Sequence, residues 1–212
     1  MPRNVTGDFL DAARTAEDLI AAPAVAAKWN EPSALREFAV SGLAGHLARQ
    51  VIMVPALLQR EAPKDPEVIG ILDHYARVPW VDAALEDEAN VSVRRSSQAE
   101  AADGPAALAR RTRDTIARLE EELPGQDLAR PVYLPWTGWA LIVADFLTTR
   151  TLELVIHVDD LVVSIGAEPV QTPGTDVVLA LLTQLAARRH GSAAVLRALS
   201  RRERAPAAIA AF

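Results

Sequence analysis

Apolar residues recur along most of the chain at spacings of three and four, which is the period of an amphipathic α-helix. Prolines, glycines and short polar runs separate these stretches and mark turns. The pattern therefore predicts a mainly helical protein. The expected helices cover approximately residues 5–22, 40–60, 65–77, 105–123, 139–165, 176–190 and 193–199.

Individual residues refine these boundaries. Pro55 lies inside the second predicted helix, so we expect a kink or an early end near Met53. Asp65 and Pro66 have the pattern of an N-cap followed by a first-turn proline. Gly166 is expected to end the longest helix.

Three stretches lack a clear helical period. Residues 80–90 are expected to form a short turn or helix, and the polar stretch 92–102 a loop. Residues 126–138, which contain two prolines and a glycine at the end, are expected to be extended or looped, with room for short β structure.

Four of the predicted helices are long, and the rest are short. This favours an all-α fold, an up-and-down four-helix bundle with additional short helices, in one domain over residues 1–212. Half of the residues are hydrophobic, which is enough for a substantial core.

Composition and charge exclude several classes of function. The net charge of −6 argues against a nucleic-acid-binding protein, and the arginine-rich stretch 197–204 is read as a solvated final helix and tail. No apolar run reaches the roughly 18 residues that span a bilayer, and we find no secretory signal pattern. A cytoplasmic location and no membrane partner are therefore expected.

The chain has no cysteine. A disulfide framework, a cysteine-ligated zinc and a cysteine nucleophile are all excluded. If the protein performs thiol chemistry, the thiol must come from a cosubstrate.

Three residues are candidates for a metal site. Glu153 and His157 are four residues apart in an apolar run, so both project from one face of the longest predicted helix. His46 lies on a second apolar helix. Two imidazoles and one carboxylate are a ligand set for an open zinc site. The alternative is a hydrogen-bonded polar cluster, because a single histidine or an i,i+4 Glu–His pair often has that role.

Other polar residues near this run have open roles. Arg150, one turn before Glu153, could orient that carboxylate, bind an anionic substrate group, or form an ordinary ion pair within the helix. One of Asp159 and Asp160 could hold an imidazole N–H. His74 and His190 lack comparable surroundings and could lie at the surface.

The sequence contains no His-Glu-x-x-His zincin motif, no glycine-rich phosphate loop and no Gly-x-Ser-x-Gly elbow. A metalloprotease of the zincin type is therefore not supported.

Several segments resemble the mycothiol-dependent maleylpyruvate isomerase family, whose N-terminal domain belongs to the DinB-like metal-binding bundles. The resemblance is carried by the stretch Ser41–Arg49 with His46, and by Asp145–Leu161 with Glu153 and His157. The region around Trp29, Gly138 and the stretch Leu196–Arg204 are also similar, so the resemblance spans most of the chain.

The resemblance implies a zinc ion, or another divalent metal, held by His46, Glu153 and His157. It also implies mycothiol as thiol cosubstrate in an actinobacterial cell, and a small electrophile as the second substrate. The expected activity is that of a thiol S-transferase or an isomerase.

The founding isomerases of this family have a second, C-terminal domain that contributes to their active site. Because the chain ends soon after Arg204, we expect that domain to be missing, which puts maleylpyruvate isomerisation itself in doubt. A non-catalytic metal-binding bundle with a structural or sensory role, and a metal-dependent hydrolase, remain open alternatives. The oligomeric state is also open, with a homodimer among the options.

Overall fold

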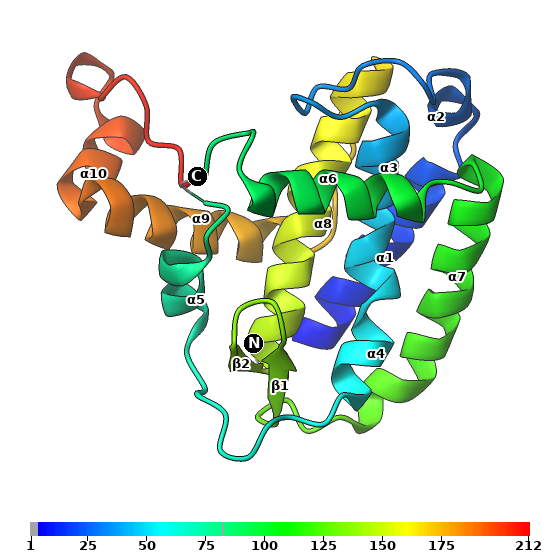
Figure 1. Cartoon of the computed structure of the whole chain (residues 1–212). Helices are drawn as coiled ribbons and strands as arrows, with labels where there is room; N and C mark the ends of the chain where they lie inside the picture. The colour runs from blue at the N-terminus through cyan, green and yellow to red at the C-terminus, as the bar shows by residue number, and fades with distance from the viewer. Residues whose placement is uncertain (1–3, 82) are drawn as a thin grey trace.

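The computed structural model describes residues 4–81 and 83–212, and Figure 1 shows that helices make up most of this part of the chain. The elements in chain order are α1 (Val5–Ile20), α2 (Pro23–Ala27), α3 (Val40–Ile52), α4 (Val54–Gln59), α5 (Ile71–Arg77), α6 (Glu88–Glu100), α7 (Pro105–Glu122), η1 (Leu123–Gly125), β1 (Pro131–Leu134), β2 (Trp139–Ile142), α8 (Val143–Ile165), α9 (Thr175–His190), α10 (Ser192–Ser200) and η2 (Arg202–Arg204).

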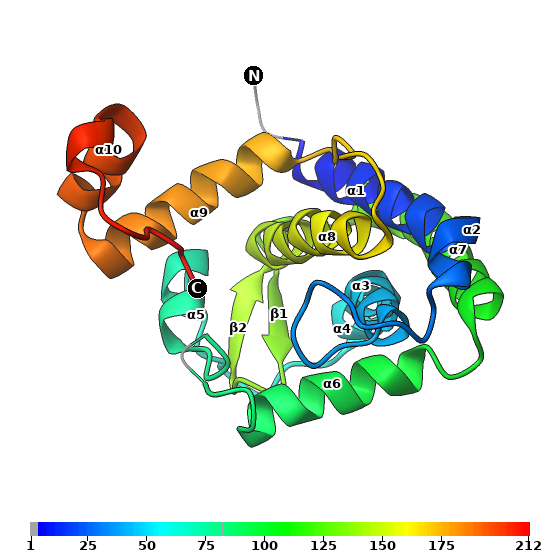
Figure 2. The same ribbon diagram turned by 90° about the horizontal axis from the view of Figure 1, so that it is seen from above.

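Helices α1, α3, α7 and α8 form the bundle. Helix α1 packs against α7 and α8, and α3 packs against the same two helices. In the view of Figure 2, α3 and α8 lie side by side, and α1 and α7 lie along one side of the molecule. The largest side chains of this core are fully buried, among them Phe9, Leu43, Leu47 and Phe146. The predicted all-α bundle with additional short helices is confirmed.

The sequence prediction was most clearly wrong at α6, because it placed a loop over residues 92–102. The polar stretch is instead most of a helix that lies along the outer side of α3 (Figure 2). Gly45 on α3 allows the close approach, since a Cβ atom there would lie 2.1 Å from the carbonyl oxygen of Ser97. Packing against α3 therefore decides the conformation of a segment whose own pattern is weak.

The second error concerns the start of the long helix, which was predicted at Trp139. Residues Trp139–Ile142 form β2, which pairs in antiparallel fashion with β1 over Pro131–Leu134. The short β structure expected in 126–138 is confirmed, but its partner strand was wrongly included in the helix. The apolar residues of β2 fit either period, and the ladder to β1 decides between them.

The helix predicted over residues 65–77 begins only at Ile71. The preceding backbone is tied to β2 instead, because Ile69 N donates to the carbonyl oxygen of Ala140, and Ala140 N donates to that of Glu67. These two bonds, 3.0 and 2.7 Å long, keep residues 67–69 extended. The Asp65-Pro66 pattern was therefore wrong as a helix start.

Two predicted breaks are confirmed. Helix α3 ends at Ile52 and α4 begins at Val54, so the chain is interrupted next to Pro55 as expected. Helix α8 ends at Gly166, whose left-handed backbone, with φ of 68°, closes the last turn.

Helices α9 and α10 lie on the other side of α8 from α1 and α7 (Figures 1 and 2), and α9 contacts α5 as well as α8. Both were predicted close to their observed bounds. Among the described residues, no helix combines the length and the apolar character needed to cross a bilayer.

Candidate metal centre

The structure brings together the three residues that the sequence singled out. His46 comes from α3, and Glu153 and His157 come from successive turns of the neighbouring α8. Oε2 of Glu153 lies 3.3 Å from Nε2 of His46 and 3.4 Å from Nε2 of His157. The three residues each offer one ligand atom, all within 4.8 Å of one another, so the cluster could hold a metal ion.

Each imidazole is held from behind by a hydrogen bond at Nδ1. Nδ1 of His157 lies 2.8 Å from Oδ2 of Asp160, one turn further along α8. Nδ1 of His46 lies 3.2 Å from Oγ of Ser97 on α6. The Ser97 hydroxyl donates to the carbonyl oxygen of Val93 at 2.7 Å, so its oxygen is left to accept from His46.

These partners fix the orientation of both rings. With Nδ1 as the donor, the Nε2 atom of each neutral ring carries a lone pair on the side of the Glu153 carboxylate. Three electron-rich atoms at such distances repel one another unless a cation lies between them. A proton can play that part, and so can a divalent metal, for which two Nε2 atoms and a carboxylate are suitable ligands.

The acid–base properties of the cluster follow from burial and from these contacts. Burial lowers the pKa of His46 more than its bond to Glu153 raises it. Burial also disfavours the charged form of His157, but its hydrogen bonds to Asp160 and Glu153 outweigh that effect and raise its pKa to about 9. Burial alone would raise the pKa of Glu153, yet the two histidines hold it well below the ordinary value. Without a metal, the proton of the cluster therefore resides on His157.

Arg150 lies behind this cluster and is buried, with 8% of its surface exposed. Its Nη1 donates to Oε1 of Gln50, and its Nε donates to Oγ1 of Thr149 at 3.1 Å. The guanidinium also lies over the ring of Phe146, 5.7 Å from the ring centre. Arg150 is thus a buried charge held between α3 and α8, on the inner side of the helix.

Gln50 connects Arg150 with His46. Its amide nitrogen donates to the carbonyl oxygen of His46 at 3.1 Å and lies 3.3 Å from Nε2 of the same residue. Sequence reasoning missed Gln50, although its position four residues after His46 on an apolar helix was a usable indication. It also missed Ser97, for which a polar stretch read as a loop gave no indication.

The cluster opens into a cavity of about 530 Å³. Helices α3, α6 and α8 supply much of its wall, together with residues near α5 and the loop before α3. Apolar side chains such as Phe38, Trp80 and Ile156 line it beside His46, Glu153 and His157. A small molecule could therefore reach the three candidate ligands.

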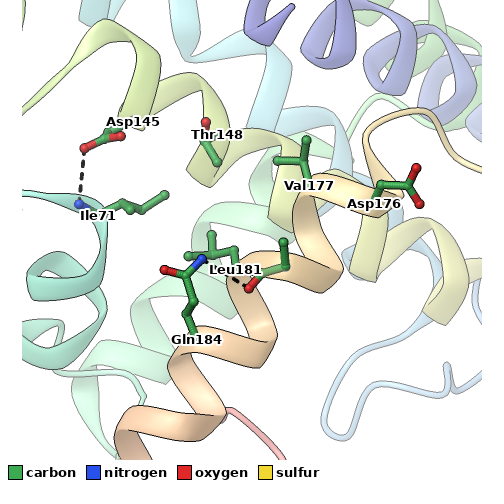
Figure 3. Close-up of a pocket in the computed structure, with 8 residues that line it drawn as sticks. Ile71, Asp145, Thr148, Asp176, Val177, Leu181 and Gln184 are labelled. Atoms are coloured by element: carbon green, nitrogen blue, oxygen red, sulfur yellow. Dashed lines mark hydrogen bonds between the residues drawn. The ribbon is translucent and has the colours of Figure 1, made fainter. Parts of the chain in front are cut away.

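A second cavity, of about 440 Å³, lies between α5, α8 and α9 (Figure 3). Its lining includes Asp145, whose Oδ2 accepts a hydrogen bond from the backbone N–H of Ile71, and Gln184 on α9. None of the predicted site residues line it.

The two remaining histidines have other environments. His74, for which a surface position was left open, is buried, and its Nδ1 accepts a hydrogen bond from Nε1 of Trp139 at 3.1 Å. Burial lowers its pKa to about 4, so it is neutral at pH 7. His190 is exposed at the end of α9, and its Nε2 lies 2.7 Å from the carbonyl oxygen of Ala210.

The fold and the cluster define a helical bundle of the DinB-like class with a candidate metal centre between its helices. Comparison with known families agrees, because the family described as "Mycothiol maleylpyruvate isomerase N-terminal domain" matches residues 9–162. The chain belongs to this family. No curated protein matches it.

Two solved structures share the fold. One is a crystal structure of the mycothiol-dependent maleylpyruvate isomerase, with 20% sequence identity, a TM-score of 0.50, and coverage of 86% of this chain and 68% of that one. The other is a histidine-to-alanine mutant of the mycothiol-dependent maleylpyruvate isomerase, with 17% identity, a TM-score of 0.52, and coverage of 89% and 72%. At this identity the likeness concerns the fold alone.

Proposed function

We propose that the protein is a zinc-dependent enzyme that uses mycothiol as a thiol cosubstrate and acts on a small electrophile as an S-transferase or an isomerase. The observation that carries the proposal is the convergence of two Nε2 atoms and one carboxylate oxygen at the base of an accessible cavity. Family membership supports the choice of mycothiol, and the absence of cysteine means that the thiol must come from outside the chain.

His46, Glu153 and His157 would hold the ion, and Ser97 and Asp160 would keep the two rings in place. Bound there, zinc would lower the pKa of a thiol so that the thiolate is available near neutral pH. The Glu153 carboxylate would offset part of the positive charge of the ion.

The chemistry proposed for the thiolate is addition to an electron-poor double bond. A carbon–sulfur bond forms, and the π electrons move onto the electron-withdrawing group. If the adduct rotates and expels the same thiolate, a cis double bond becomes trans. If the adduct instead takes a proton from water at carbon, the product is the thioether of a transferase reaction.

The charges around the cavity favour an anionic electrophile. Arg36, Arg49 and Arg94 line it in addition to Arg150. Among the described residues that line it, Glu153 is the only acidic one. In the part of the chain that the structure describes, none of these three arginines forms an ion pair. This local group of positive charges is notable in a protein whose net charge is −6.

The proposal can be tested with cobalt in place of zinc. Thiolate binding to cobalt adds an intense sulfur-to-metal charge-transfer band in the near ultraviolet, so mycothiol should produce this band and glutathione a weaker one. His157→Ala should lose both the metal and the band. A metal that binds without any band on addition of mycothiol would remove the thiol from the proposal and favour a hydrolase or a non-catalytic metal-binding bundle.

A further inference from the structure

We infer that Gln50 donates a hydrogen bond from its side-chain amide to the ligand bound next to His46, and that Arg150 is the positioning residue that turns the amide in this direction. The inference rests on the proposed metal site and assigns a new role to two residues of its surroundings. Gln50 would contact the sulfur of the thiol cosubstrate, or the atom of another ligand that takes its place.

The first step is the direction in which the Gln50 amide points. A guanidinium has only donors, so the amide atom that faces Nη1 of Arg150 must be the oxygen. The NH₂ group then lies on the opposite side, toward His46. A flipped amide would place two donors against each other at Arg150, which burial of both side chains makes costly.

The second step is the number of acceptors that the NH₂ group needs. One of its hydrogens is taken by the carbonyl oxygen of His46 at 3.1 Å. The other faces Nε2 of His46 at 3.3 Å, where the lone pair of the ring accepts it. Gln50 is only 3% exposed, so water cannot readily replace either acceptor.

The third step is what metal binding changes. The Nε2 lone pair of His46 is the one that a metal would take, because Nδ1 is already engaged with Ser97. The second N–H of Gln50 then loses its acceptor while it stays within reach of whatever occupies the neighbouring space. Gln50 lines the same cavity as the three candidate ligands, so a bound sulfur or oxygen atom is the acceptor that the geometry offers.

The role of Arg150 follows from the same contacts. It comes from α8, touches Gln50 on α3, and is itself fixed by Thr149 and by the ring of Phe146. It therefore acts through Gln50. A lysine at position 150 keeps the charge but offers a single, flexible donor group, so it would hold the amide less firmly.

The experiment uses the cobalt-loaded full chain with 2-mercaptoethanol as a simple thiol probe. A hydrogen bond to the bound sulfur stabilises its lone pairs and shifts the charge-transfer band to shorter wavelength. Gln50→Met is of similar size but has no donor. We expect it to keep the metal, to bind the thiol about tenfold more weakly, and to move the band to longer wavelength. Arg150→Lys should also weaken thiol binding and move the band to longer wavelength, but by smaller amounts.

Gln98→Met is the matched control, because Gln98 is exposed on α6 and bonds to Ser41 away from the cluster. It should leave thiol affinity and band position unchanged. A second measurement needs no variant: in the zinc-loaded wild type, the side-chain amide proton of Gln50 that faces Nε2 should shift when the thiol is added.

The role of Gln50 would be overturned if Gln50→Met had the same thiol affinity and band position as the wild type. It would also be overturned if the amide resonance of Gln50 did not move when the thiol is added. If the wild type itself takes up no metal, the proposed function fails and this inference fails with it. If the wild type binds the metal and the thiol and Gln50→Met behaves like it, the proposed function stands. Only the role assigned to Gln50 is then refuted. These outcomes separate the two claims.

Discussion

Nδ1 of His157 lies 2.8 Å from Oδ2 of Asp160, one helical turn further along α8. The carboxylate accepts the Nδ1 hydrogen and so leaves Nε2 directed at Glu153, on the side of the cavity. Such a carboxylate–histidine pair raises the basicity of the ring and fixes its orientation, both of which favour a metal ligand.

The first prediction follows from this pair. Asp160→Asn keeps an oxygen that can accept the Nδ1 hydrogen but removes the charge. We expect the affinity for zinc to fall by about 10- to 100-fold, measured by competition with a chelator of known affinity. Asp159→Asn is the control, because Asp159 is exposed on the same turn. Equal losses in the two variants would mean that Asp160 acts only through the overall charge.

The second prediction concerns the metal ligands themselves. His46→Ala and His157→Ala each remove one of three candidate ligands, so we expect little bound metal, against roughly one ion per chain in the wild type. Elemental analysis after dialysis measures this directly. His190→Ala should retain the metal, since His190 is exposed at the end of α9. Full metal content in His157→Ala would refute the proposed ligand set.

The third prediction is the pH dependence of stability without metal. His157 has its pKa raised from 6.5 to about 9 in the folded protein, so the folded state binds this proton more tightly than the unfolded state. The resulting stabilisation is complete below about pH 6.5 and is lost as the pH rises through about 9.

Urea unfolding in the presence of EDTA, at several pH values across this window, measures the effect. We expect the free energy of unfolding of the wild type to fall with rising pH, and His157→Gln to lack this part of the decrease. Parallel curves for the two proteins would show that His157 does not carry the proton. The free energy of unfolding of the zinc-saturated protein should follow a different pH dependence, because metal binding requires the neutral ring.

The fourth prediction concerns the contact between α3 and α6. A Cβ atom at position 45 would lie 2.1 Å from the Ser97 carbonyl oxygen, so Gly45→Ala forces the two helices apart. We expect a loss of about 1–3 kcal/mol in the free energy of unfolding, measured by chemical denaturation. Metal affinity should fall as well, because Ser97 would move away from His46.

Gly70→Ala provides the matched control for this variant. No atom of the described residues lies within 4 Å of a Cβ atom at position 70, so the free energy of unfolding should change by no more than about 0.5 kcal/mol. A loss in Gly45→Ala as small as in Gly70→Ala would contradict the close packing of the two helices.

Helix periodicity, with its breaks at Pro55 and Gly166, was enough to predict the bundle helices, and spacing along α8 was enough to pair Glu153 with His157. Both are local properties, because residues one turn apart share a helix face whatever surrounds them. The position of His46 opposite that pair was a hypothesis that only the packing of α3 on α8 could turn into distances.

Other features could not be predicted because they depend on contacts between distant segments. The polar residues of α6 become helical against Gly45, Trp139–Ile142 becomes a strand against β1, and His74 becomes buried beneath Trp139. The same holds for Gln50, whose amide direction depends on Arg150, a hundred residues later. The sequence by itself determined the helical period and the kinds of ligand atoms. The tertiary structure decided which atoms face one another, because hydrogen-bond partners between helices are set by packing, which no local pattern encodes.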